Sequence, residues 1–211
     1  MRKEELSISM LMSAPIIRNV ARMFSRQRDR DIRACILSQI PSNAVCAEIG
    51  VYKGDFSELI LEHAPKKLHL VDPWMFEVDL AYAGSWYGGT LGKSQAKMNT
   101  IYKSVISRFR FEIRSEVVEV HRNTSAKACS QFPDNYFDWI YIDGNHLYEF
   151  VKLDLEMFLP KVKVRGLVAG DDYGSPGWWQ DGVTKAVDEA VASGRFDKLL
   201  IENHQFLLRK L

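Results

Sequence analysis

The sequence predicts an α/β fold in which a mostly parallel sheet carries helices on both faces and ends in an antiparallel hairpin. Two observations predict this fold. Five short apolar runs alternate with helical stretches, which is typical of a parallel sheet covered on both sides. The last two apolar runs are separated only by Asn203 and His204, a connection too short for a crossover helix.

Each expected element has a local signature. The runs expected to form parallel strands are Ala44–Ile49, Leu68–Val71, Val117–His121, Tyr136–Ile142 and Leu167–Gly170. The expected hairpin pairs Lys198–Glu202 with Gln205–Leu208. Before the first strand, apolar side chains recur at near-helical spacing from Arg18 to Ile40, and Pro41 ends that segment. We therefore expect an N-terminal helical extension over residues 1–40 and one domain over residues 41–211.

Composition limits the classes of partner. The chain has 211 residues, of which 46% are hydrophobic and 26% charged, and this suits a single domain with an ordinary core. The formal net charge of +1 gives no electrostatic field that would attract nucleic acid. No apolar run has the length of a membrane span. We therefore expect neither a nucleic-acid partner nor a membrane-spanning segment.

The cysteines and the N-terminus indicate a compartment. Cys35, Cys46 and Cys129 are odd in number and have no C-x-x-C spacing, which argues against a disulfide framework and a thiolate zinc site. Glu4 and Glu5 interrupt the basic start of the chain, so a signal peptide is not predicted. A reducing setting is the simplest one, and we expect a cytoplasmic protein.

The segment over residues 74–100 differs from the rest of the chain. Its aromatic residues are Trp74, Phe76, Tyr82, Trp86 and Tyr87, and they are interspersed with Gly84, Gly88, Gly89 and Gly92. A long insertion of this kind after a strand is usually functional. We interpret it as a substrate lid, and the alternative is a loop whose aromatic side chains cover the core.

A cofactor site is predicted where the first strand ends. Glu48, Gly50, Tyr52 and Gly54 form the pattern Glu-x-Gly-x-Tyr-x-Gly, and a helix is expected to open at Asp55. Glycines let a backbone pass close to a ligand, and a helix N-terminus offers free N–H groups. A fixed negative charge on Glu48 would disfavour a pyrophosphate but tolerate a cationic sulfonium. The loop therefore favours a cofactor with a positive end.

Two further residues fit a nucleoside. Asp72 ends the second strand, 22 residues past Gly50, where a carboxylate can accept hydrogen bonds from ribose hydroxyls. A turn or helix cap before Pro73 is the alternative. Ser125, after the third strand, is placed to bond an adenine edge, and this stretch could equally cap the following helix.

A chemical site is predicted at the ends of the fourth and fifth strands. The fourth run ends in Asp143, with His146 three residues later, and the fifth ends in Asp171 and Asp172. Adjacent parallel strands bring these ends side by side. Three carboxylates that converge repel each other unless a cation neutralises them, and oxygen ligands suit Mg²⁺. Helix caps and a plain turn are the alternative for the aspartates, and a structural role is the alternative for His146.

Together these motifs resemble the small metal-dependent O-methyltransferases of class I, which have a Rossmann-like fold and use S-adenosylmethionine. The animal catechol enzyme and the bacterial macrocin-type sugar enzymes are similar over roughly residues 44–173. The resemblance implies a general base at His146. It implies a Mg²⁺ site at Asp143, Asp171 and Asp172. It implies a cofactor site at Glu48, Gly50, Tyr52, Gly54, Asp72, Ser125 and Asp143.

The resemblance also bears on the substrate. Asp172 stands where the catechol branch has asparagine, and the aromatic insertion is longer than in that branch. Both differences favour a small-molecule hydroxyl substrate of sugar type. The alternatives are a metal-independent methyltransferase that uses His146 alone, an NAD-dependent oxidoreductase, and a binding module without activity. The N-terminal helical segment could also pair with another copy to form a homo-oligomer.

Overall fold

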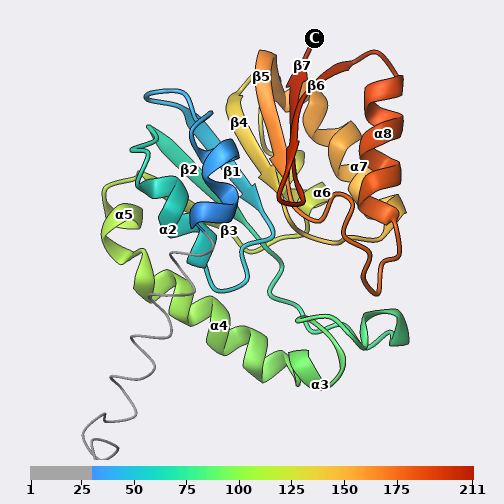
Figure 1. Cartoon of the computed structure of the whole chain (residues 1–211). Helices are drawn as coiled ribbons and strands as arrows, with labels where there is room; N and C mark the ends of the chain where they lie inside the picture. The colour runs from blue at the N-terminus through green and yellow to red at the C-terminus, as the bar shows by residue number, and fades with distance from the viewer. Residues whose placement is uncertain (1–29) are drawn as a thin grey trace, which may run out of the picture.

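The computed structural model describes residues 30–211, which form a seven-stranded sheet in the order β3-β2-β1-β4-β5-β7-β6 (Figure 1). The strands are β1 Val45–Ile49, β2 Lys67–Val71, β3 Val118–His121, β4 Phe137–Ile142, β5 Val162–Gly170, β6 Phe196–Glu202 and β7 Gln205–Lys210. The first five pair in parallel, whereas β7 runs antiparallel to both β5 and β6. The predicted mixed sheet is confirmed.

The local sequence is sufficient to predict the hairpin but not the start of β5. Asn203 and His204 have φ values of 50° and 65°, as the tight turns that join antiparallel strands require. β5, in contrast, starts five residues before the predicted Leu167. Its first half is half-buried or exposed after Val162, and its pairing with β4 shifts register between Phe137 and Trp139. An exposed, irregular start gives no apolar run for a pattern to detect.

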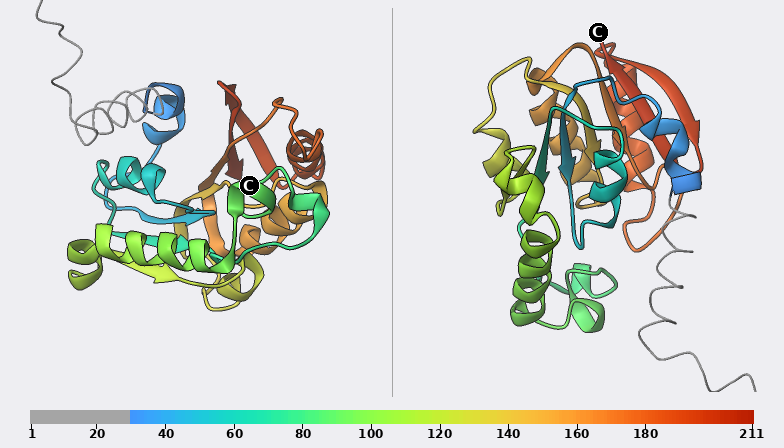
Figure 2. Two further views of the ribbon diagram at one scale, coloured as in Figure 1. Left: turned by 90° about the horizontal axis from the view of Figure 1, so that it is seen from below. Right: turned by 90° about the vertical axis from the view of Figure 1, so that its left-hand side faces the viewer.

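Helices cover both faces of the sheet, as predicted (Figures 1 and 2). They are α2 Asp55–Leu61, α3 Gly89–Gly92, α4 Gln95–Arg108, α5 Arg110–Arg114, α6 Ser125–Cys129, α7 Tyr148–Phe158 and α8 Gly182–Ala192, with short 3₁₀ turns η2 Leu80–Tyr82 and η3 Leu159–Lys161. Apolar side chains of α2 and α4 form one core cluster with the strands. Those of α6, α7 and α8 form the other cluster, on the opposite face.

Residues 30–37 are helical and pack on the α2 and α4 side, where Ile36 and Leu37 are buried. The rest of the helix predicted from Arg18, with the remainder of the N-terminal extension, lies outside the described residues. Within residues 30–211, none of the helices combines the length and apolar character that crossing a bilayer would require.

The turn after β1 is tied to the ends of two neighbouring strands. Gly50 N donates to the Val71 carbonyl at 2.9 Å, and Asp143 N donates to the Ile49 carbonyl at 2.8 Å. Gly50 has a φ of 94°, and a Cβ atom built on it would lie 2.0 Å from the Asp143 carbonyl oxygen. The glycine is therefore needed for the close approach of two backbone segments. That approach fixes the position of the Asp143 backbone beside the turn after β1.

We expect Gly50→Ala to lower the free energy of unfolding by more than the roughly 1–3 kcal/mol that a left-handed conformation alone costs. Urea unfolding measures the loss. Gly174→Ala is the matched control, because Gly174 has a φ of 70° and a Cβ atom there would meet no other atom within 4 Å. Equal losses in the two variants would contradict a tight contact at Gly50.

Candidate active site

The carboxyl ends of β4 and β5 lie next to each other, because Ile142 pairs with Gly170. The residues that follow these ends are Asp143 and Asp171. His146 lies between two carboxylates: its Nε2 is 3.2 Å from Asp143 Oδ1 and its Nδ1 is 3.4 Å from Asp172 Oδ2. One side-chain ligand atom from each of these three residues lies within 4.8 Å of the others. The structure thus brings together Asp143, His146 and Asp172, three of the predicted residues.

The electrostatics of His146 follow from its neighbours. Burial lowers the pKa of His146, but the hydrogen bond to Asp143 and the charges of Asp143, Asp172 and Asp171 outweigh burial, so the pKa is raised. A positive charge near the imidazole would lower the pKa of His146 instead. The Trp179 ring packs edge-on against the imidazole, with ring centroids 4.7 Å apart. The imidazole is thereby held in place by two carboxylates and one indole.

Asp171 is not one of these three residues, and both of its carboxylate oxygens accept hydrogen bonds from protein donors. Its Oδ2 accepts from the Arg33 guanidinium, and its Oδ1 accepts from Gln205 Nε2 and from the Asp172 backbone N–H. Arg33 also donates from Nε to the Tyr141 hydroxyl at 3.0 Å. Burial raises the pKa of Asp171, and the charge of Asp143 adds to the rise. Asp171 is therefore a neighbour of the cluster, and its oxygens are held by protein donors.

Asp172 has the conformation of a constrained residue. Its φ is 64°, a left-handed value that is uncommon for a residue other than glycine. Burial raises the pKa of Asp172 to about 6, against the opposing effect of His146. Such backbone strain tends to occur at functional sites. Here it accompanies a carboxylate that faces His146.

Asp72 is fully buried beneath the loop that follows β1. Its Oδ2 accepts from the backbone N–H groups of Val51 at 3.0 Å and Tyr52 at 2.9 Å, and from the Tyr87 hydroxyl. Its Oδ1 accepts from Trp74 N at 2.6 Å. Burial raises the pKa of Asp72, and these hydrogen bonds offset part of the rise. Asp72 thus organises the predicted cofactor loop.

Glu48 is also buried, and its carboxyl accepts from the Ser57 hydroxyl on α2. Burial raises the pKa of Glu48 well above its usual value, against the effect of that hydrogen bond. Burial therefore opposes a negative charge at this position, whereas the Ser57 hydrogen bond and the charge of Arg33 favour one. Charge interactions link Glu48 to both Asp143 and Asp72, so the two halves of the site are neighbours.

Gly54 and Ser125, two further residues of the predicted cofactor site, also contact neighbouring helices of the fold. Gly54 has a φ of 74°, and a Cβ atom there would lie 2.6 Å from the Phe109 ring. Ser125 is half-buried at the start of α6 and hydrogen-bonds Asp154, whose pKa burial raises to about 6. Thr124, the preceding residue, caps the helix. The expected capping role in this stretch belongs to Thr124.

The aromatic insertion over residues 74–100 packs on the predicted cofactor loop. The Trp86 and Tyr87 rings lie 5.8 Å and 5.7 Å from the Tyr52 ring, and Tyr52 has a φ of 49°. Trp74 is fully buried in the core, whereas Trp86 is 58% exposed. The first tryptophan of the insertion is thus a core residue, as the alternative interpretation expects, and its later aromatic residues cover the loop. The substrate lid stays a prediction.

The other end of the insertion reaches the strand-end cluster. The Tyr82 hydroxyl accepts from Asn145 Nδ2 at 2.8 Å, one residue before His146. The Tyr82 ring packs edge-on against Trp178, at 5.6 Å between centroids. Residues 74–100 therefore contact both the loop after β1 and the loops after β4 and β5.

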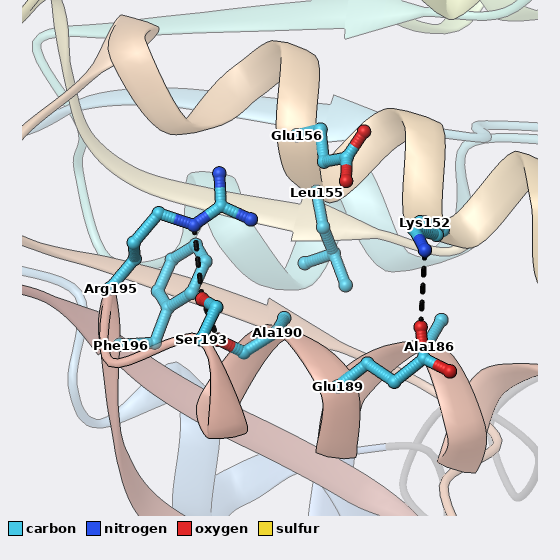
Figure 3. A pocket seen from close by; sticks show the side chains of 9 residues that line it. All are labelled: Lys152, Leu155, Glu156, Ala186, Glu189, Ala190, Ser193, Arg195 and Phe196. Atoms are coloured by element: carbon cyan, nitrogen blue, oxygen red, sulfur yellow. Dashed lines mark hydrogen bonds and ion pairs between the residues drawn. The ribbon is translucent and has the colours of Figure 1, made fainter.

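The structure adds Arg33, Gln205 and the pair Trp178 and Trp179, which the sequence does not predict as site residues. The tryptophans have a usable signal, because they follow the predicted Asp171–Asp172 strand end within a turn-rich stretch. Arg33 and Gln205 have none, since they lie 138 and 34 residues from Asp171 along the chain. A groove between α7 and α8, lined by residues such as Lys152 and Glu189 (3.2 Å apart), contains none of the predicted site residues (Figure 3).

Comparison with known proteins assigns the family. A family model described as a methyltransferase domain matches residues 47–173, which include the loop after β1 and both strand-end aspartate groups. The chain belongs to this methyltransferase family. It is therefore an S-adenosylmethionine-dependent methyltransferase. A search of the curated proteins finds no match to its sequence.

Solved structures show the same fold at low sequence identity. The O-methyltransferase NovP is 22% identical, with a TM-score of 0.58 over 87% of this methyltransferase and 79% of NovP. The N-methyltransferase NodS from Bradyrhizobium japonicum is 13% identical, with a TM-score of 0.53 over 88% of this chain and 97% of NodS. A Corynebacterium glutamicum protein is 12% identical, with a TM-score of 0.58 over 96% and 92% of the two chains. At these sequence identities, the similarities show the fold alone.

Proposed function

We propose that this methyltransferase methylates a hydroxyl oxygen on a small, sugar-like molecule, and that a divalent cation, Mg²⁺, assists the reaction. The observation that carries the proposal is the convergence of Asp143, His146 and Asp172, with ligand atoms within 4.8 Å of one another at the ends of β4 and β5. This is the edge at which open α/β sheets bind their ligands. NovP, a structural neighbour, is an O-methyltransferase.

The donor set fits a hard cation in part. Asp143 and Asp172 present carboxylate oxygens on either side of His146, and carboxylates are the protein ligands that Mg²⁺ prefers. Asp171 would complete the predicted set only if it shared an oxygen with the ion while Arg33 and Gln205 remain bound. We therefore assign Asp143 and Asp172 as the main ligands and Asp171 as a third carboxylate beside them. A bound Mg²⁺ would supply positive charge that favours the deprotonated form of the acceptor hydroxyl.

His146 is the proposed general base. Both of its ring nitrogens face carboxylates, and a neutral imidazole that takes the hydroxyl proton becomes a cation that these carboxylates stabilise. The acceptor oxygen then bonds to the methyl carbon. The carbon–sulfur bond breaks with its electron pair going to sulfur, which leaves S-adenosylhomocysteine. Trp179 and the lid residue Tyr82 flank this region and would limit access of water.

The cofactor is proposed to lie against the loop formed by Gly50, Tyr52 and Gly54, with Asp72 as the ribose partner. In the structure the Tyr87 hydroxyl and backbone N–H groups occupy the Asp72 carboxylate. The backbone donors shape the loop and would stay. The Tyr87 hydroxyl belongs to the lid, so ribose binding requires it to move.

We expect Tyr87→Phe to tighten S-adenosylhomocysteine binding by about tenfold, because a hydrogen bond to a charged acceptor is worth about 1.5–3 kcal/mol and the ligand no longer displaces one. Calorimetric titration of the full chain measures the affinity. Trp86→Phe is the matched control, since Trp86 contacts Tyr52 and is exposed. Weaker binding by Tyr87→Phe would instead show that the tyrosine holds the cofactor.

An acceptor screen tests the reaction class. The full chain is incubated with methyl-labelled S-adenosylmethionine, Mg²⁺ and panels of sugars, catechols, amines and thiols. Transfer to sugar hydroxyls in preference to the other panels is the expected result. Transfer to amines alone would overturn the oxygen assignment, and transfer to catechols alone would overturn the substrate class.

A further inference from the structure

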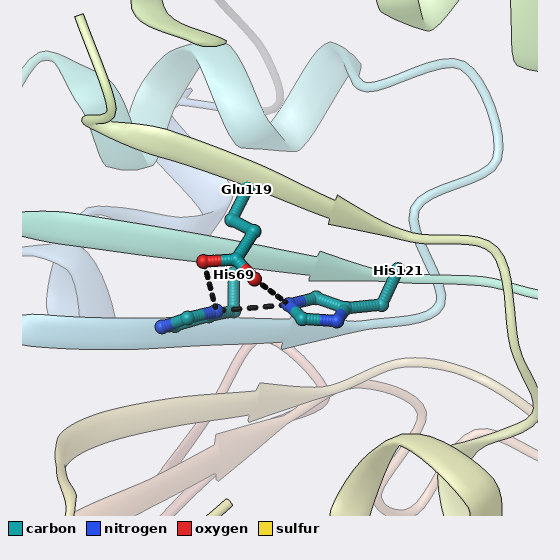
Figure 4. Close-up of side chains that lie close together, drawn as sticks. All are labelled: His69, Glu119 and His121. Atoms are coloured by element: carbon teal, nitrogen blue, oxygen red, sulfur yellow. Dashed lines mark hydrogen bonds and ion pairs between the residues drawn. The ribbon is translucent and has the colours of Figure 1, made fainter. Parts of the chain in front are cut away.

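A second cluster of metal-ligating side chains lies on the opposite side of β1 from the strand-end site. It comprises His69 on β2 and Glu119 and His121 on β3, the edge strand (Figure 4). The parallel register pairs His69 with Glu119 and Val71 with His121, so the three side chains share one face of the sheet. This placement is fixed by backbone pairing and does not depend on a loop.

The distances are close to those of a coordination shell. His69 Nδ1 and His121 Nε2 lie 2.9 Å apart. Glu119 Oε2 is 3.8 Å from His69 Nδ1, and Glu119 Oε1 is 3.6 Å from His121 Nε2. Ligands about 2.0–2.1 Å from a tetrahedral ion are separated by slightly more than 3 Å, so small side-chain rotations are sufficient. The two imidazole nitrogens hydrogen-bond each other in the structure, and a metal ion would replace that bond.

The surroundings support the histidines as ligands. The outer nitrogen of His69 contacts the Tyr136 hydroxyl at 3.1 Å, and a Gln131 side chain hydrogen-bonds His121. Metal-binding histidines usually have such a partner on the second nitrogen, which fixes the tautomer and the ring orientation. Both imidazoles are almost fully buried, whereas the Glu119 side chain is 47% exposed. The open side of Glu119 provides an entry path for an ion.

We propose that His69, Glu119 and His121 form a site for a borderline transition metal, Zn²⁺, with water in the remaining position. Two imidazoles and one carboxylate form a ligand set that zinc takes with an open fourth position. The nitrogen donors also distinguish this site from the aspartate-rich cluster at β4 and β5, which suits a harder ion. The two sites use different strands, β2 and β3 for one and the ends of β4 and β5 for the other, with β1 between them.

One residue competes with the metal. Lys67 Nζ lies 2.8 Å from Glu119 Oε2, and zinc would have to share or take that carboxylate. This gives a matched pair of variants. Lys67→Met and Glu119→Gln both break the same ion pair, so a purely structural ion pair predicts similar consequences for both. A metal site predicts opposite effects on zinc affinity.

The test is a titration of the EDTA-treated, dialysed full chain with Zn²⁺, and with Co²⁺ as a spectroscopic substitute, in excess Mg²⁺ to occupy the strand-end site. We expect one equivalent of Co²⁺ with the intense visible absorption of four-coordinate cobalt. Glu119→Gln should weaken Zn²⁺ binding by at least about 100-fold, and Tyr136→Phe by about 10–100-fold. Lys67→Met should tighten it by up to about fivefold, the value of an exposed ion pair.

Further variants separate this site from the strand-end site. Asp172→Asn should leave the cobalt spectrum unchanged, and His121→Asn should abolish it. Circular dichroism and the unfolding midpoint in EDTA confirm that each variant is folded, and Glu119→Gln, at a half-exposed edge position, is the variant least at risk. The proposal is overturned if folded Glu119→Gln binds zinc as tightly as the wild type. It is equally overturned if Lys67→Met and Glu119→Gln both weaken binding.

Discussion

Treatment with EDTA is expected to abolish methyl transfer, and added Mg²⁺ is expected to restore it. An alcohol is not deprotonated near neutral pH by an imidazole alone, and the charge of a metal supplies the missing stabilisation of the anion. The carboxylates of Asp143 and Asp172 beside His146 are the groups proposed to hold that charge. Initial rates with labelled S-adenosylmethionine, measured across a Mg²⁺ titration, check this expectation.

The adjacent aspartates provide a matched pair for the same experiment. Asp172→Asn should raise the Mg²⁺ concentration needed for half-maximal rate and be partly rescued by excess metal, because a neutral amide binds Mg²⁺ more weakly than a carboxylate. Asp171→Asn should mainly lower stability, by about 1–3 kcal/mol, because it weakens the partner of the partly buried Arg33. Urea unfolding and the Mg²⁺ titration measure the two effects separately.

Two outcomes would contradict this assignment. If chelation leaves the rate unchanged, no metal takes part and the metal-independent alternative, with His146 as sole base, becomes the better account. If Asp171→Asn shows the larger metal requirement, Asp171 binds the ion despite its bonds to Arg33 and Gln205. The ligand set first predicted from the sequence would then be the better one.

The sheet could be predicted because its strands are apolar, short and bounded by residues that end strands. β1, β2 and β3 start within one residue of their predicted positions. β5 starts earlier than predicted because Lys163, Val164 and Arg165 are half-buried or exposed and carry no apolar pattern. Exposed strand ends are set by pairing with a neighbour, which a local pattern does not contain.

The part of the candidate site that could be predicted is the part that follows from the order of the strands in the sheet. The adjacency of β4 and β5 places Asp143, His146 and Asp172 together, as the spacing predicts. Asp171 is hydrogen-bonded to Arg33, which comes from a helix far earlier in the chain. Likewise, the Tyr87 hydroxyl reaches Asp72 only because the insertion folds back on the loop after β1. Tertiary packing decides both contacts.

His146→Ala is expected to lower the maximal rate of methyl transfer by about 10²–10⁴-fold, the usual contribution of a positioned general base. The imidazole lies between Asp143 and Asp172, and no other part of the proposed mechanism takes the hydroxyl proton. Excess Mg²⁺ should not rescue the variant, in contrast to Asp172→Asn. His63→Ala, a change at an exposed histidine after α2, is the control for loss of any histidine.

Binding measurements on the same variant separate a base from a metal ligand. His146→Ala should keep the S-adenosylhomocysteine affinity of the wild type, and its Mg²⁺ affinity should be nearly unchanged, because the carboxylates of Asp143 and Asp172 remain. A large loss of metal affinity would make His146 a ligand, since its nitrogens lie within 3.4 Å of both carboxylates. Full activity of the variant at every pH would remove the base assignment, and the imidazole would then serve to hold two carboxylates and Trp179 in place.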